Sequence, residues 1–293
     1  MLMTIRSLFQ QLMQQERLNF LLTNRIPRHG LTIFMGWFSK IEQPLVRMLS
    51  IGVWRRFADL NLHEAKKTQF SSMHDCFTRE LKDGARPIDD DVNALVSPCD
   101  GIVGACGAVE GVQVFQAKGY PYNLLDLVGD PETIRRYRNG CYATIRITSS
   151  MYHRFHAPLD CRVKCVNYIS GDTWNVNPIA LKRVEKLFCK NERAVLHTEC
   201  ANTGQEILLV PVAAVLVASI RLHCVDTLLH LKYAGPNKIE CDASYKKGEE
   251  MGWFQHGSTI IVFTPPGYQL AANIREGSPL RVGEKLMVRM TGI

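Results

Sequence analysis

No continuous apolar run in this 293-residue chain approaches the roughly 18 residues that a membrane-spanning helix needs. The longest candidate, residues 207–220, is interrupted by Pro211, so we expect buried strands there. A secretory signal peptide is not expected, because Arg6, Glu16 and Arg17 break up any apolar core near the start. There is no internal repeat or low-complexity tract. With 46% apolar and 22% charged residues, the composition excludes a disordered, collagen-like or coiled-coil protein.

Metal-binding cysteine motifs are also missing, although the chain has ten cysteines. No Cys-x-x-Cys pair occurs, and spacings such as Cys161/Cys165 and Cys99/Cys106 are not those of a zinc knuckle. The chain is long enough to build a core without disulfides. We therefore expect reduced cysteines packed as small apolar side chains, and no metal site.

Positive charge is concentrated at one end. Residues 1–67 carry ten Lys or Arg and four Asp or Glu, which is +6 of the total net charge of +7. Residues 1–22 have apolar side chains at helical spacing, and residues 31–38 form a second apolar stretch that contains Trp37. This region is either an ordinary helical subdomain or an amphipathic module that lies on an anionic membrane.

From about residue 68 the pattern changes to short apolar runs separated by glycine and proline, which is typical of a β-rich domain. Residues 141–148 and 259–263 are predicted strands, so Ser258 should lie where a loop enters a strand. A helix is predicted to begin at Asn177-Pro178 and to carry an apolar face as far as Phe188. The predicted fold class is α+β, with a helical region over residues 1–67 and a β-rich catalytic domain over residues 68–293.

Three short motifs, at residues 97–101, 152–158 and 256–259, together supply an acid, an imidazole and a hydroxyl. Each is weak alone: an Asp-Gly pair usually marks a turn, and two histidines can simply line a strand end. In combination they are the groups that activate a serine, which is a poor nucleophile without a nearby base.

The glycine before the serine suggests a more specific chemistry. Without a Cβ, Gly257 permits strained backbone geometry in which the Ser258 hydroxyl reaches the preceding carbonyl carbon. Attack there would turn the peptide bond into an ester. Loss of the serine α-proton would then expel the upstream carboxylate and leave dehydroalanine, which hydrolyses to a pyruvoyl group.

These motifs, in this order, resemble the phosphatidylserine decarboxylase family of bacteria and mitochondria. Three further stretches carry the same resemblance, at residues 171–178 (GDTWNVNP), 191–196 (NERAVL) and 247–254 (KGEEMGWF). The resemblance implies a cut between Gly257 and Ser258, giving a large chain of residues 1–257 and a small chain of residues 258–293. Ser258 would become the pyruvoyl cofactor, which holds the substrate as a Schiff base while carbon dioxide leaves and phosphatidylethanolamine is formed.

The resemblance also assigns roles and a setting. Asp100 and His156 match the base system that activates the serine, and His153 matches the histidine implicated in decarboxylation. The protein would lie peripherally on the cytoplasmic side of the cell membrane, with phosphatidylserine in an anionic bilayer as its substrate. A homodimer or higher assembly is expected, and no nucleic-acid partner.

Two departures from the family pattern stand near the motifs. His256 precedes the glycine where many bacterial members have leucine, so a third imidazole near the cut could alter its rate. Ala213 and Ala218 replace glycines that are usual in relatives, which could change how closely the backbones pack there. Neither departure removes a proposed chemical group.

Three other functions remain open from the residues alone. A serine hydrolase could use Asp100, His156 and Ser258, although no Gly-x-Ser-x-Gly motif is present. A metal enzyme could use His153 with His156 and Asp100, which leaves the Gly-Ser-Thr sequence unexplained. A non-catalytic protein could bind membranes or nucleic acid through the basic region; because its basic residues alternate with large apolar ones, lipid is favoured.

Overall fold

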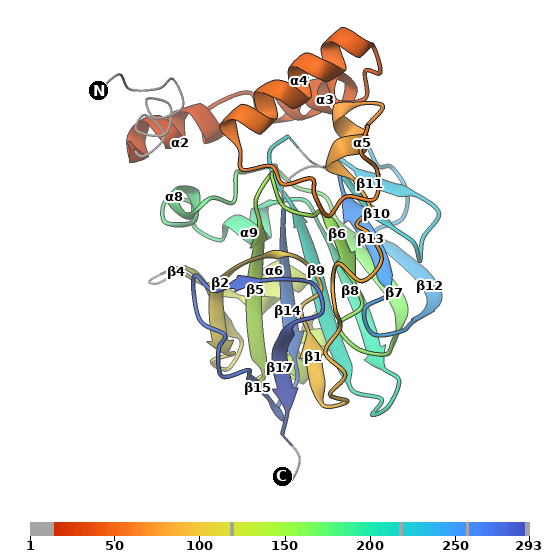
Figure 1. Ribbon diagram of the computed structural model, residues 1–293. Coiled ribbons are helices and arrows are strands. Elements are labelled where there is room, and N and C mark those ends of the chain that lie inside the picture. Colours follow the sequence, from red (N-terminus) through yellow and green to blue (C-terminus); the bar gives the residue numbers. More distant parts are fainter. Residues whose placement is uncertain (1–14, 118–119, 217–218, 256–257, 291–293) are drawn as a thin grey trace, which may run out of the picture.

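The computed structural model describes residues 15–117, 120–216, 219–255 and 258–290, and Figure 1 shows the arrangement of their elements. The helices are α2 (Glu16–Asn24), α3 (Arg28–Phe38), α4 (Pro44–Phe57), α5 (Met73–Phe77), α6 (Leu124–Val128), α7 (Pro131–Tyr137), α8 (Pro178–Leu181) and α9 (Leu187–Lys190). The strands are β1 (Ala94–Val96), β2 (Gly101–Ala108), β3 (Gln113–Ala117), β4 (Tyr120–Asn123), β5 (Cys141–Ile147), β6 (Arg154–His156), β7 (Cys161–Ile169), β8 (Arg193–Cys200), β9 (Glu206–Ala213), β10 (Ser219–Leu222), β11 (Leu228–His230), β12 (Lys238–Tyr245), β13 (Glu250–Phe254), β14 (Ser258–Thr264), β15 (Tyr268–Leu270), β16 (Pro279–Leu280) and β17 (Lys285–Arg289). Helices gather near the start and strands dominate the rest, so the predicted α+β class is confirmed.

An eight-stranded antiparallel sheet is the centre of the fold. Its order is β12-β7-β8-β9-β14-β5-β2-β16, which places β14 between β9 and β5. The β-branched run that begins β14 favours an extended strand, and all seven of its residues are buried. Ser258 is the first residue of this strand, as the sequence predicted.

Both faces of this sheet are covered, so β14 is apolar on each side. Ile260 and Val262 belong to one core cluster, with residues of the four-stranded sheet β11-β10-β13-β6. Ile261 and Phe263 belong to a second cluster, with residues of the short helices α6, α8 and α9. Because successive side chains in a strand point to opposite faces, Ser258 shares the face of Ile260 and Val262.

The helix predicted from Asn177-Pro178 begins where expected, with the Asn177 side chain accepting from the Ala180 backbone N–H, but it is not continuous. The structure has two short helices, α8 and α9, and Lys186 between them adopts a left-handed φ of 52°. The buried Gln116 side chain enters this break. Its amide donates to the carbonyls of Leu181 and Val184 and accepts from the Leu187 N–H, so it replaces bonds that a continuous helix would make.

Helices α2, α3 and α4 lie at one end of the molecule, at the top of Figure 1. The apolar stretch at residues 31–38 is helical, as predicted, within α3. Residues 1–14, most of the first predicted amphipathic helix, lie outside the described residues. Within the described part of the chain, no helix has the length and apolar character that a membrane crossing requires. The boundary proposed at residue 67 stays a prediction.

Candidate active site

Ser258 lies between two neighbouring strands at the head of β14. Its register partners are Ile147 at the end of β5 and Ala213 at the end of β9. The residue has no solvent exposure, and its hydroxyl has no hydrogen-bond partner among the described residues. An unsatisfied buried hydroxyl is uncommon and costs stability, so it marks a position that calls for an explanation. The predicted cleavage partner Gly257, and His256 before it, lie outside the described residues.

The strand that leads toward Ser258 is packed unusually tightly. Gly252 in β13 has a φ of 159°, and a Cβ at this position would lie 2.0 Å from the carbonyl oxygen of Arg221 in β10. Only glycine fits so close an approach. The approach fixes β13 against β10, six residues before the described segment resumes at Ser258.

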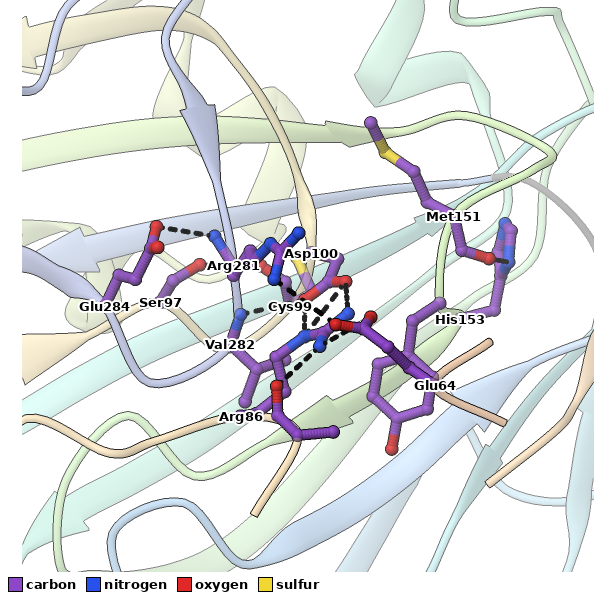
Figure 2. A network of polar contacts seen from close by, with 12 residues as sticks. Glu64, Arg86, Ser97, Cys99, Asp100, Met151, His153, Arg281, Val282 and Glu284 are labelled. Carbon is purple, nitrogen blue, oxygen red and sulfur yellow. Dashed lines mark hydrogen bonds and ion pairs between the residues drawn. The ribbon is translucent and has the colours of Figure 1, made fainter. Parts of the chain in front are cut away.

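Asp100 lies in a buried ion-pair network at the start of β2. Its carboxylate accepts from the Arg86 guanidinium at 2.9 and 2.6 Å, and from the backbone N–H of Val282 at 2.9 Å. Arg86 also donates to Glu64 at 2.9 Å. Figure 2 shows Asp100 between Arg86 and Val282, with Glu64 next to Arg86. The network thereby connects the predicted large chain to residue 282 of the predicted small chain.

His156, in β6, is fixed by both of its ring nitrogens. Nδ1 lies 2.9 Å from the Gly248 carbonyl oxygen, and Nε2 lies 3.0 Å from the Tyr152 hydroxyl. Since a carbonyl only accepts, Nδ1 carries the proton and the tyrosine hydroxyl donates to Nε2. Burial lowers the pKa of His156, although Glu250 and Asp100 oppose the shift. The imidazole is therefore held neutral in one orientation.

His153 is fully buried at the start of the turn into β6. Its Nδ1 lies 2.9 Å from the carbonyl oxygen of Met151, and because a carbonyl only accepts, Nδ1 carries a proton and donates it to this bond. The ring lies on Phe77 of α5, with 3.9 Å between ring centroids. The backbone carbonyl of His153 accepts from the Phe254 N–H at 3.0 Å. His153 is thus attached to the end of β13, the end nearest to Ser258 in the sequence.

The structure gathers Asp100, Tyr152 and His156 into one polar cluster around Arg86 but does not join Asp100 to His156 directly. Among the described residues, no hydrogen bond connects either of them to Ser258. In Figure 2, His153 and Met151 lie apart from the Asp100 network. His156 is three residues further along β6 than His153, about 10 Å in an extended strand. Arg86 and Tyr152 are parts of the cluster to which sequence reasoning gave no role.

A cavity of about 440 Å³ opens beside the register partners of Ser258. Ile147 and Ala214 line it from the sheet, and Phe77 lines it from α5. Three more of its lining residues, Met35, Trp54 and Met73, also line a groove of about 590 Å³ on the helices. The groove is lined almost wholly by apolar side chains of α3 and α4. An apolar path therefore leads from the helices to the neighbours of Ser258.

The helices expose many large apolar side chains. Trp37 and Met48 are each 63% exposed, which is unusual for residues of this kind. The others on α2, α3 and α4 are Leu21, Leu22, Ile33, Phe34, Leu45, Leu49, Val53 and Phe57. Large apolar side chains exposed in this number on neighbouring helices are typical of a surface that contacts a membrane or another macromolecule.

No group of three metal-ligating side chains occurs among the described residues. His153 and His156 instead have the carbonyl and hydroxyl partners given above. The alternative of a metal enzyme therefore finds no ligand set in the described part of the chain.

The fold and the site define an α+β protein with a buried serine at the head of a central strand, whose hydroxyl has no partner among the described residues and whose register partner Ile147 lines a cavity. The family model for phosphatidylserine decarboxylase matches residues 73–288. Proteins named phosphatidylserine decarboxylase proenzyme are similar over most of the chain. The one from Hahella chejuensis (strain KCTC 2396) is 32% identical over 92% of this chain and 93% of its own length. Those from Histophilus somni (strain 2336) and Saccharophagus degradans are each 33% identical, over 92% and 89% of this chain and 95% and 93% of their own. The chain belongs to the phosphatidylserine decarboxylase family.

Proposed function

We propose that this chain is the proenzyme of a carboxy-lyase that converts phosphatidylserine to phosphatidylethanolamine, and that it activates itself by cutting between Gly257 and Ser258. The observation that carries the proposal is the Ser258 hydroxyl, which is fully buried at the head of β14 and has no partner among the described residues. A nucleophile that must attack its own backbone has to be kept from water and from competing hydrogen bonds. The family membership supplies the reaction.

The self-cleavage balances without an outside oxidant or reductant. The Ser258 oxygen attacks the Gly257 carbonyl carbon, the C–N bond breaks, and an ester forms. Removal of the Ser258 α-proton expels the upstream chain as a carboxylate and leaves dehydroalanine. Water then releases ammonia and leaves a pyruvoyl group at residue 258. This ketone supplies an electron sink for decarboxylation of an amine-bearing substrate.

The residues around Ser258 fit such a group. Ala213, its register partner in β9, is small, and Ile147, its register partner in β5, lines the cavity. We propose that the predicted site residues act in two different reactions, self-cleavage and decarboxylation. Asp100 and His156 serve the cleavage, since their contacts hold Val282 on one side of the cut and Gly248 on the other. His153, on Phe77 at the cavity, serves the decarboxylation.

The activity is tested with vesicles that contain phosphatidylserine labelled at the serine carboxyl carbon. We expect release of labelled carbon dioxide, and hydroxylamine, which reacts with ketones, should abolish it. The serine hydrolase alternative predicts a different result: fatty acid or headgroup release by an uncut chain, with no labelled gas.

The membrane is the proposed partner surface, reached through α2, α3 and α4. The exposed apolar side chains of these helices would enter the lipid interface, and the net positive charge of residues 1–67 would attract anionic headgroups. The groove between α3 and α4 continues into the cavity beside Ile147, which gives the headgroup a path to residue 258. We place the protein peripherally, on the cytoplasmic side of the cell membrane. The expected homodimer or higher assembly stays a prediction.

Replacing both Trp37 and Met48 with glutamate should weaken binding to phosphatidylserine vesicles. Each side chain loses apolar area that would enter the interface, and each new charge is repelled by the anionic surface, so we expect a loss of about a hundredfold in flotation assays. The matched control is Val92→Glu, because Val92 is 83% exposed but lies outside the helices. Equal binding by the double variant and the control would contradict the membrane assignment.

A further inference from the structure

Glu192 is a buried carboxyl group to which the proposed chemistry gives no role. The residue has no solvent exposure, and neither carboxyl oxygen has a hydrogen-bond partner among the described residues. Its polar neighbours in the sequence are engaged elsewhere. Arg193 donates to the carbonyls of Leu127 and Cys189, and the Asn191 amide donates to that of Ala213. A carboxyl buried in this way is costly, and such groups mark functional sites more often than structural ones.

The backbone places Glu192 in one row with Ser258. The Ala213 N–H donates to the Glu192 carbonyl at 2.8 Å, which continues the β8–β9 register by one residue, and Ala213 pairs with Ser258. Directly opposite residues of neighbouring antiparallel strands share a face of the sheet. Glu192 and Ser258 therefore occupy the same face of the sheet. Their backbones are two strand spacings apart, which is about 9.6 Å. Only the methyl group of Ala213 stands between them.

The chemistry of the carboxyl suits a proton acceptor for an amine. Burial alone raises the pKa of Glu192 to about 8. This value lies about two pKa units below that of an alkyl ammonium, whereas an ordinary glutamate lies about six units below it, so Glu192 is the better matched acceptor for an ammonium proton. An approaching ammonium favours the ionised carboxylate, because opposite charges at short range stabilise each other.

Resting on the function proposed above, we propose that Glu192 is a further catalytic residue, which accepts a proton from the ammonium of the incoming aminophospholipid. One N–H bond breaks, one O–H bond forms on the glutamate, and the nitrogen lone pair becomes available to attack the carbonyl carbon at residue 258. Glu192 would thereby also select headgroups that bear an amine. Self-cleavage, which involves no amine substrate, should not need it.

The test compares wild type with Glu192→Gln, which keeps the shape but cannot take the proton. Borohydride reduction traps the bond between residue 258 and phosphatidylserine, and mass spectrometry of the small chain measures how fast it forms. At pH 7 we expect the variant to form this adduct about a hundredfold more slowly. The rate should recover as the pH rises and the lipid amine loses its proton in solution. The variant should cut itself at the wild-type rate. It should also react with hydroxylamine at the wild-type rate, because hydroxylamine is unprotonated at pH 7 and needs no proton acceptor.

Two further variants keep the test decisive. Glu185→Gln removes an exposed carboxyl nearby in the sequence and should behave as wild type. Glu192→Met leaves no buried polar atom, so it should fold even if Glu192→Gln does not, and it should show the same slow, pH-restored adduct. A folded Glu192 variant that fails to cut itself, or that forms the adduct at the wild-type rate at pH 7, would overturn the assignment. A wild-type chain without a hydroxylamine-reactive group would instead overturn the function on which it rests.

Discussion

Ser258→Ala should leave the chain in one piece and without activity. The substitution removes the only atom that can attack the Gly257 carbonyl in the proposed cleavage, so no ketone is formed and both steps are lost. We expect no detectable cut product after long incubation, and a loss of labelled carbon dioxide release to background. The effect is larger than that of any other single change, because the residue is both nucleophile and precursor of the cofactor.

The loss must be separated from a folding defect. Ser258 makes no side-chain hydrogen bond among the described residues, so alanine at this position removes no stabilising contact and the melting temperature should not fall. Thr264→Val is the matched control, since it removes another buried hydroxyl of β14, at the other end of the strand. That variant should still cut. A Ser258→Ala chain that is cut at the same position would rule out the serine as the nucleophile.

The second large effect is a split between the two histidines. His156→Ala should block self-cleavage almost completely, because it releases the contacts to Gly248 and to the Tyr152 hydroxyl that hold the cluster beside Asp100. His153→Ala should cut normally but decarboxylate poorly, by about a hundredfold or more, since its ring packs on Phe77, which lines the cavity, and lies apart from the Asp100 network (Figure 2).

The two reactions are measured separately on the same preparations, cleavage by gel and decarboxylation by carbon dioxide release per mole of hydroxylamine-reactive chain. Tyr152→Phe is an informative companion to His156→Ala, because it removes only the hydroxyl that donates to Nε2. It should slow cleavage less than His156→Ala does. An uncut His153→Ala chain would show that His153 takes part in the cleavage, and the proposed division would be wrong.

Local sequence chemistry predicted the elements that carry the site. The run of β-branched residues after Ser258 was enough to place it at a strand head, and the apolar stretch at residues 31–38 was enough to predict α3. Asn177-Pro178 correctly marked a helix start. The break before α9 was not predictable, because it depends on Gln116, which lies 65 to 71 residues before the backbone groups that its side chain satisfies.

Only part of the site could be predicted from the sequence, because the strand register decides which residues lie opposite one another. Motifs identified four site residues, Asp100, His153, His156 and Ser258. They did not predict that Asp100 pairs with Arg86 and Val282 rather than with His156. Glu192 lies within a motif that was recognised, yet its place beside Ser258 exists only because β9 joins β8 to β14. The cavity likewise combines side chains from α3, α4, α5 and the sheet, so no single segment of the sequence could predict it.

An intact-mass spectrum of freshly purified wild-type chain, with and without hydroxylamine, shows whether the chain cuts itself and turns Ser258 into a ketone. The uncut chain has a mass of 33.2 kDa. Our account predicts two species instead: a large one ending at Gly257, and a fragment of residues 258–293 of about 4 kDa, at roughly 110 Da per residue. The small fragment alone should gain the mass of an oxime. A single species at full mass that gains nothing from hydroxylamine would contradict the account.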